Sequence, residues 1–302
     1  TEYFDYDYSP LQSFKRWAFD FDAFAADMRL LVRGLDNLID CGGYPLEELK
    51  TAAKLRRKIG AGIMGYGSLL MMMGIRYGSE RAMKFTEDLM KVMANVGYDE
   101  SAEIAKEKGP FLLYNEEEIF NGGFIKNSGV LREATLEKIK KYGLRNSQIL
   151  TVAPTGTISI FAGCISGGIE PVFEKDYIRW VISNHEAKKL LKGLDYPQWA
   201  KDEWKQTKDF KFHMVGDTQV LLSKDGQLMI DQSRGLTKKV QVLDYGYLKA
   251  QEIYGDMIDK MEENGIFACA QDLTAEEHLD PFILLSQHID NSISKTVNLP
   301  HD

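Results

Sequence analysis

Residues 150–171 read LTVAPTGTISIFAGCISGGIEP and join a short apolar run to two turn signals. The run Leu150–Ala153 predicts a buried strand that ends at Pro154. The hydroxyl and glycine residues that follow, Thr155–Ser159, direct several backbone N–H groups and hydroxyls toward one point. If a helix begins there, its dipole adds partial positive charge. Gly156 lets the backbone approach a ligand without a Cβ in the way. The pattern fits a phosphate site, and it also fits a capped helix start or threonine-rich turn without a ligand.

Composition narrows the function classes. The chain has 302 residues, 44% of them hydrophobic, which is enough for one large core or two modest ones. With 37 basic and 45 acidic side chains the net charge is −8, which argues against a broad electrostatic grip on DNA or on a membrane. No secretory signal precedes the first helix, and five glycines interrupt the apolar stretch 59–75. We therefore predict a cytoplasmic protein with no direct DNA or membrane contact.

Cysteine and histidine usage gives no metal site and no disulfide framework. Cys41, Cys164 and Cys269 are far apart and lack paired spacing, which is typical of a reducing cytosol. We expect all three to be small packing residues. The five histidines show no ligand spacing.

Hydrophobic periodicity and turn residues predict alternating helices and strands, hence an α/β fold. A polar loop is expected over 116–130, and a hairpin around Lys224–Gly226. Ser79 is the expected cap of the longest helix. The predicted helices cover 15–40, 44–58, 68–75, 79–108, 134–143, 246–265 and 274–289. The predicted strands cover 148–153, 266–270 and 292–300, and residues 59–67 are expected to form a short strand or a tight turn.

Gly60–Gly65 matches the dinucleotide-binding pattern GxGxxG letter for letter. That motif requires a hydrophobic strand before the first glycine, but the preceding residues read AAKLRRK and predict a basic helix. The acidic residue needed about 20 positions later would fall inside the next helix, at Glu80–Glu87. Close packing of a strand against its neighbours explains these glycines better. An NAD(P)-linked dehydrogenase built on them is the weaker alternative.

Three motifs in order resemble one enzyme family. Residues 145–173, RNSQILTVAPTGTISIFAGCISGGIEPVF, resemble the substrate-phosphate segment of ribonucleotide reductase large subunits, and the resemblance is closest to the adenosylcobalamin-dependent class. Residues 35–80 and the segment DNSISKTVNLP at 290–300 resemble the family's flanking motifs. The likeness extends over 25–180 and 265–300 and is poor over 185–250.

The resemblance implies a fold and a site. The family's catalytic domain is a ten-stranded α/β barrel of two half-barrels, each of five parallel strands. Residues 1–302 resemble only the second half, with a family-atypical insertion at about 185–250, and another chain or segment would complete the barrel. In the family, the segment matching Pro154, Thr155, Gly156, Thr157 and Ile158, with Ser159 beside it, binds the diphosphate or triphosphate of a ribonucleotide.

The family's radical chemistry needs residues that this sequence lacks. The radical cysteine lies in an Asn-x-Cys-x-Glu loop, and no such loop occurs here. The resemblance therefore implies an N-terminal partner chain or segment, adenosylcobalamin shared with it, and a thioredoxin-type reductant. We expect this chain to be inactive alone and to hold no catalytic cysteine. Because it begins without methionine, we interpret it as a processed product, one product of a split gene, or an excised fragment.

The loop after the hydroxyl residues is a candidate active-site loop through Cys164, Gly168 and Glu170. Cys164 fits a buried thiol near the site better than a redox group. Glu170 approaches the substrate, orients the loop, or serves as a turn carboxylate; the sequence leaves these alternatives open. Lys295 receives no role. A non-catalytic scaffold that has kept the fold and lost the substrate is a further alternative.

Overall fold

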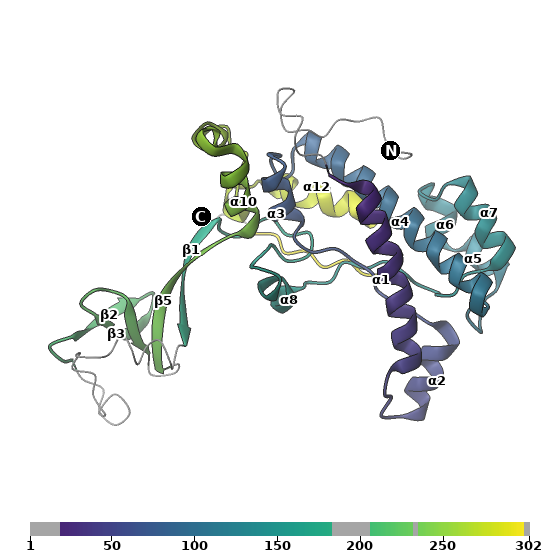
Figure 1. Cartoon of the computed structure of the whole chain (residues 1–302), viewed down its shortest axis with the longest axis horizontal. Helices are drawn as coiled ribbons and strands as arrows, with labels where there is room; N and C mark the ends of the chain where they lie inside the picture. The colour runs from purple at the N-terminus through teal and green to yellow at the C-terminus, as the bar shows by residue number, and fades with distance from the viewer. Residues whose placement is uncertain (1–18, 183–205, 232–234, 299–302) are drawn as a thin grey trace. The chain divides into compact units, whose positions relative to one another are not determined.

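The computed structural model describes residues 19–182, 206–231 and 235–298. The chain forms two compact units, one of residues 1–175 and 244–302 and one of residues 176–243. Figure 1 follows the chain through both. The first unit contains the helices, and the second contains a β-sheet. Together they make the chain α/β, as predicted.

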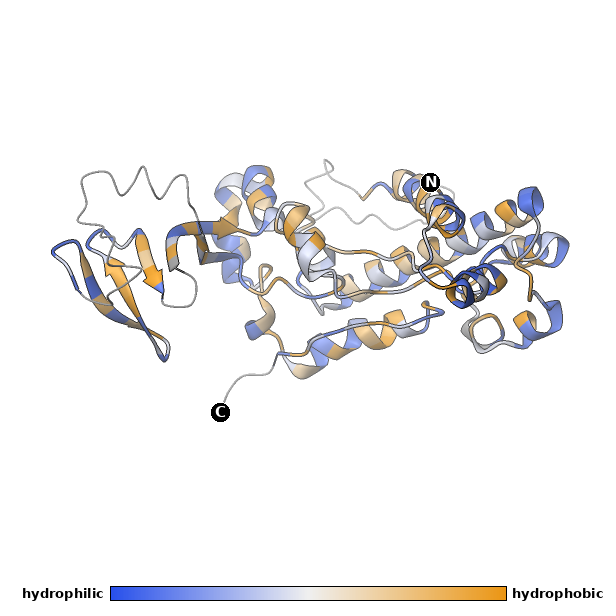
Figure 2. Ribbon diagram, turned by 90° about the horizontal axis from the view of Figure 1, so that it is seen from below, coloured by the Kyte–Doolittle hydropathy of each residue, from blue (hydrophilic) through white to orange (hydrophobic). Residues whose placement is uncertain are grey.

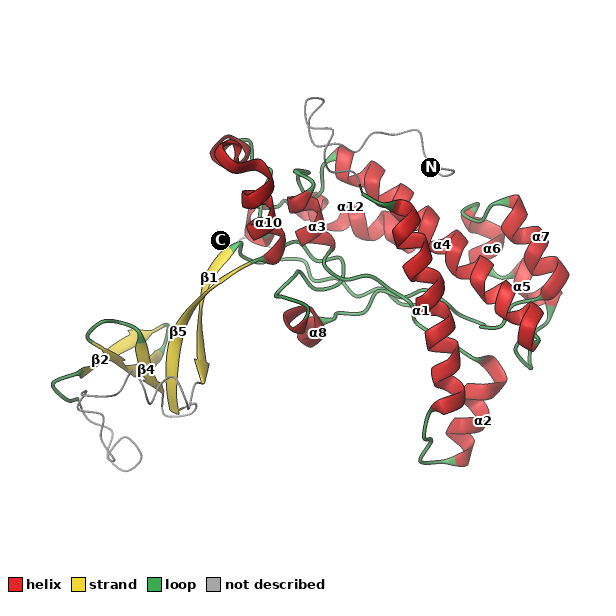
Figure 3. Cartoon of the chain, in the orientation of Figure 1, coloured by secondary structure: helices red, strands yellow, loops and turns green. Residues whose placement is uncertain are grey.

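Helices dominate the first unit (Figure 3). The expected long helix is α4, which Ser79 caps by accepting a hydrogen bond from the N–H of Ala82, and it ends at Gly109. Helix α1 confirms the first predicted helix, except for residues 15–18, which lie outside the described residues. The bounds are α1 Phe21–Cys41, α2 Glu47–Arg56, α3 Tyr66–Met72, α4 Glu80–Lys108, α5 Glu116–Asn121, α6 Gly123–Ser128, α7 Glu133–Tyr142, α8 Gly156–Phe161, α10 Tyr245–Tyr254, η2 Gly255–Met257, α11 Ile258–Glu263, η3 Ala270–Asp272 and α12 Ala275–Ser286.

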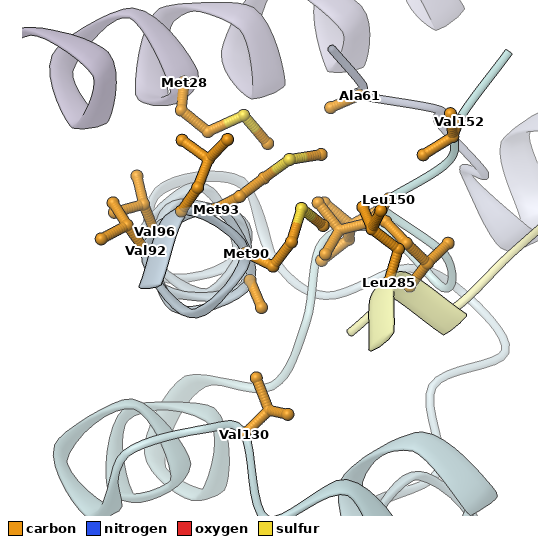
Figure 4. Packing of buried hydrophobic residues seen from close by; sticks show 14 of the residues in the cluster. Met28, Ala61, Met90, Val92, Met93, Val96, Val130, Leu150, Val152 and Leu285 are labelled. Carbon is orange, nitrogen blue, oxygen red and sulfur yellow. The ribbon is translucent and has the colours of Figure 1, made fainter. Parts of the chain in front are cut away.

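The core of this unit surrounds α4. Side chains of α4 such as Met90 and Met93 pack with Met28 of α1, Leu150 of an extended segment and Leu285 of α12 (Figure 4). The helices that contribute carry hydrophilic and hydrophobic residues together, as Figure 2 shows, and turn their apolar stripe inward. The extended segment that leads into residues 154–159 is therefore anchored in the core.

Three extended segments lie side by side in this unit. A parallel bridge joins Ala61 to Leu150, and a second joins Val152 to Ile293. The segments correspond to the short strand or tight turn predicted at 59–67 and to the strands predicted at 148–153 and 292–300. Each described segment pairs only through isolated bridges and not through a continuous ladder. Their parallel direction agrees with the family resemblance. A half-barrel of five parallel strands stays a prediction.

Close packing accounts for the glycines of the GxGxxG match, as expected. A Cβ at Gly62 would lie 2.3 Å from the carbonyl oxygen of Thr151, and one at Gly60 would lie 2.8 Å from the Thr151 methyl carbon. Gly65 has φ +78° at the start of α3. The absent side chains thus let segment 59–62 approach segment 149–152.

Three predictions of secondary structure are wrong, the loop at 116–130 and the helix at 246–265 in part and the strand at 266–270 entirely. The loop expected at 116–130 holds α5 and α6, because Asn115 caps α5 and three glutamates in its first turn favour a helix start. The strand expected at 266–270 is a turn that continues into η3, since the N–H of Ile266 bonds back to Met261. The helix expected at 246–265 breaks at Gly255, which has φ +52°.

The second unit is a five-stranded sheet in the order β1-β5-β4-β3-β2, with every neighbouring pair antiparallel. Its small core contains Phe210, Leu221, Leu228 and Ile230. The expected hairpin is confirmed, because β3 pairs with β4 around Gly226. The bounds are β1 Asp176–Ile182, β2 Phe210–Val215, β3 Thr218–Ser223, β4 Leu228–Asp231 and β5 Gly235–Leu243. These strands are antiparallel and so are not the five parallel strands that the resemblance implies.

Candidate functional site

The turn after the core segment centres on Thr155. Its φ and ψ of 51° and 17° lie in the left-handed region, which a β-branched residue rarely adopts. The Thr155 hydroxyl oxygen accepts a 2.7 Å hydrogen bond from the N–H of Gly168. The second glycine turn of the quoted sequence therefore fixes the conformation of the first. Such a strained backbone is typical of functional sites.

Helix α8 begins directly after this turn. The N–H groups of Gly156, Thr157 and Ile158 come before the first residue whose N–H bonds inside the helix, Ser159, which donates to the Thr155 carbonyl at 2.9 Å. All three residues are exposed, as is Pro154. A Cβ on Gly156 would meet no atom within 4 Å. The helix start thus presents backbone donors in open space.

Ser159 differs from its neighbours. Its side chain is buried, and its hydroxyl donates to the carbonyl of Gly156 at 3.3 Å. The structure thus places five of the six predicted phosphate-site residues on the surface or at the turn, and places Ser159 beneath them. Ser159 thus contributes a hydrogen bond to the turn, and its predicted contact with phosphate stays a prediction.

The candidate loop residues are brought near this turn. At Gly167, an added Cβ would lie 2.9 Å from the carbonyl oxygen of Pro154, and at Gly168 it would lie 2.8 Å from that of Ala153. Gly168 has φ +43°. The loop and the turn therefore form one tightly packed unit, residues 154–159 with 167–170, which we call the phosphate turn after the site predicted there.

The cysteines do not lie as expected. Cys164 is half-exposed rather than buried, with φ +62° and its Sγ 3.8 Å from the carbonyl oxygen of Ile160. Cys41 is exposed at the last residue of α1, so its predicted packing role is wrong. Cys269 is half-buried, and burial raises the pKa of its thiol.

A further set of hydrogen bonds, which the sequence analysis did not predict, supports the loop at Ser166. The Ser68 hydroxyl accepts from the N–H of Ser166 at 2.8 Å and donates to Asp244 at 2.8 Å. Asp244 also caps α10, and burial raises the pKa of its carboxyl. The sequence does show Asp244 just before a helical pattern, which is typical of a helix cap. It does not indicate the contact with Ser68, because the two residues are 176 positions apart.

Both carboxylate oxygens of Glu170 are engaged by the last extended segment. One of its carboxylate oxygens accepts from Lys295, and the other from the N–H of Thr296. Among the roles predicted for Glu170, these contacts favour orientation of the loop, and an approach to the substrate stays a prediction. The sequence analysis gave Lys295 no role and therefore missed its contact with Glu170.

The described residues were also compared with the requirements of a metal site and of a membrane-spanning helix. Within 19–182, 206–231 and 235–298, no group of three or more His, Cys, Asp or Glu side chains is arranged to hold a metal ion. Among the helices described there, none combines the length and apolar character needed to cross a bilayer.

Together these features define an α/β chain with a donor-rich turn at the end of a parallel-bridged segment. Residues 10–302 match the family model described as ribonucleotide reductase, barrel domain, and the chain belongs to this family. The resemblance to the large subunit of these enzymes is confirmed.

Curated relatives agree with this assignment. A vitamin B12-dependent ribonucleoside-diphosphate reductase of Mycobacterium tuberculosis is 28% identical over 93% of this chain and 32% of its own length. One with the same name from Thermoplasma acidophilum is 34% identical over 55% of this chain and 19% of its own length. A ribonucleoside-diphosphate reductase large chain of Encephalitozoon cuniculi is 27% identical over 78% of this chain and 35% of its own length. The chain thus spans about a third or less of the length of these relatives.

Proposed function

We propose that this chain binds the phosphate groups of a ribonucleotide as part of a ribonucleotide reductase. The observation that carries the proposal is the exposed helix start at Gly156, Thr157 and Ile158, whose N–H groups have no acceptor inside α8. The names of the relatives support a ribonucleoside diphosphate as the substrate. The triphosphate remains the alternative.

In this proposal the radical chemistry belongs to another segment or chain. A thiyl radical on the cysteine of the Asn-x-Cys-x-Glu loop abstracts the ribose 3′-hydrogen, and a cysteine pair supplies two electrons for loss of the 2′-hydroxyl as water. A thioredoxin-type reductant restores the pair. The same N-terminal part completes the ten-stranded barrel and covers the open edges of the parallel-bridged segments. The present chain would be inactive without it, and the enzyme would act in the cytoplasm.

Adenosylcobalamin is proposed as the cofactor on the strength of the B12-dependent relatives. Two of the described histidines, His278 and His288, already engage backbone carbonyls, which makes them poor cobalt ligands. Nε2 of His278 lies 2.9 Å from the carbonyl oxygen of Ala270, and Nδ1 of His288 lies 3.0 Å from that of Leu284. We therefore place the residues that hold the cofactor in the N-terminal part of the enzyme.

Replacing Thr157 with valine is expected to weaken binding of CDP by the complete reductase about tenfold or more. The exposed hydroxyl would be one of the phosphate donors, and a hydrogen bond to a charged group contributes about 1.5–3 kcal/mol. Isothermal titration calorimetry measures the change. Thr51→Val, at an exposed threonine of α2, is the matched control and should bind normally. Unchanged affinity in Thr157→Val would remove this hydroxyl from the site, and no CDP binding by the unmodified enzyme would favour the scaffold alternative.

A further inference from the structure

A partly buried ion pair joins the phosphate turn to the last extended segment. The Lys295 ammonium lies 3.1 Å from Oε2 of Glu170, and the Lys295 side chain is only 3% exposed. The other carboxylate oxygen, Oε1, accepts a 2.7 Å hydrogen bond from the N–H of Thr296. One carboxylate thus holds two adjacent residues of the segment 292–298, 125 positions away in the sequence.

The ammonium has further partners on its other sides. It donates to the carbonyl of Thr296 at 2.7 Å and lies 3.2 Å from Nδ1 of His278, a fully buried residue of α12. Because Nε2 of His278 faces the carbonyl of Ala270, the ring donates there and leaves Nδ1 as an acceptor for Lys295. The Tyr77 ring lies 5.8 Å from the ammonium. The Lys295 ammonium is therefore held by contacts with Glu170, Thr296 and His278.

A short series of hydrogen bonds leads from this pair to the exposed helix start. The N–H of Glu170 donates to the carbonyl of Gly167 at 2.7 Å, which closes the glycine turn. The hydroxyl of Tyr77 donates to the carbonyl of Ile169 at 2.7 Å. Gly168, inside that turn, donates to the hydroxyl oxygen of Thr155. The conformation of Thr155 thus depends on the glycine turn 167–170, and the ion pair of Glu170 with Lys295 anchors the end of that turn.

We propose that Lys295 and Glu170 are positioning residues for substrate phosphate: their ion pair holds the glycine turn that keeps Thr155 left-handed and the helix start open to the ligand. The inference rests on the proposed function of the phosphate turn. Three facts carry it: both oxygens of one carboxylate are engaged, the ammonium is enclosed, and Gly168 bonds directly to the strained residue. Removing the Lys295 ammonium from water costs free energy, and only an ion pair with further hydrogen bonds offsets that cost.

Lys295→Met is expected to weaken CDP binding by the complete reductase roughly tenfold, because the glycine turn loses its anchor without any change in the exposed donors. Glu170→Gln, which keeps an acceptor for the Thr296 N–H, should show a loss in the same direction and serves as the second variant if Lys295→Met does not fold. Lys138→Met is the matched control. That lysine pairs with Glu103 at 2.7 Å on α7 and α4 and is 26% exposed, and its loss should leave CDP affinity unchanged.

The pH profile separates positioning from mere structural support. The groups facing the ammonium are Glu170, His278 and Tyr77. Burial lowers the pKa of Lys295, against the opposing effect of Glu170. The charged form, present below that pKa, makes the pair, so CDP affinity of the unmodified enzyme should fall as pH rises toward 10.5. Lys295→Met should lack this fall, and Lys138→Met should retain it.

The outcomes separate the two proposals. Tenfold weaker binding by the folded variant, with the alkaline fall abolished, supports the positioning role. Normal CDP affinity in a folded Lys295→Met or Glu170→Gln, with the alkaline fall intact, overturns it and leaves the phosphate turn standing. Absence of CDP binding in the unmodified enzyme overturns the proposed function itself.

Discussion

Replacing Asp36 with alanine is expected to lower the free energy of unfolding by about 3–5 kcal/mol, because it breaks a buried ion pair from one side. Asp36 is fully buried, and its Oδ1 accepts from Nε of Arg57 at 2.8 Å. Arg57 is only 4% exposed. Asp36 also accepts from Asn146 at 3.1 Å. Urea unfolding with linear extrapolation measures the change.

Asp40→Ala provides the matched control for this prediction. Asp40 binds the same guanidinium at 2.9 Å, but its side chain is 45% exposed, so water replaces it at a cost of about 1 kcal/mol or less. An Asp36→Ala protein as stable as Asp40→Ala would show that burial does not govern this network. The network matters for the site because Arg57 and Asn146 precede the paired segments 59–62 and 149–152.

Gly156→Glu is expected to reduce CDP affinity about a hundredfold or more while leaving the fold intact. The new side chain would meet no atom within 4 Å of its Cβ, and an acidic residue suits the start of α8. Its carboxylate would stand where the substrate phosphates are proposed to bind, and like charges placed together cost several kcal/mol. Calorimetric titration with CDP, alongside a thermal melt, measures both quantities.

Gly156→Ala separates charge from bulk in this experiment. The methyl group also has open space, so stability should stay the same or rise slightly, since alanine favours a helix over glycine. Its affinity should fall between those of the unmodified enzyme and Gly156→Glu. Equal, normal binding by both variants would place the phosphates elsewhere.

The sequence predicted the features of this site that depend on neighbouring residues. The turn at Thr155, the helix start at Gly156 and the packing role of Gly60 and Gly62 follow from local composition and spacing, and the structure has all of them. For Ser159 the sequence did not predict the local contact that the structure shows. Its hydroxyl bonds to the carbonyl of Gly156, while its predicted contact with phosphate stays a prediction.

Contacts between distant residues could not be predicted in the same way. Glu170 and Lys295 are 125 residues apart, and nothing in the segments GGIEP or SISKT indicates that they meet. Periodicity also failed where capping decided the structure, as at Asn115 before α5. The apolar run 266–270 resembled a strand because apolar pattern alone does not distinguish a short strand from a buried turn.

The most direct measurement is a crystal structure of the complete reductase with CDP bound. Phosphate oxygens should lie within about 3 Å of the amide nitrogens of Gly156, Thr157 and Ile158, as charge-assisted hydrogen bonds require. A structure in which this turn is buried or closed by its own side chains, with the phosphates at Gly60–Gly65 or elsewhere, would contradict the account.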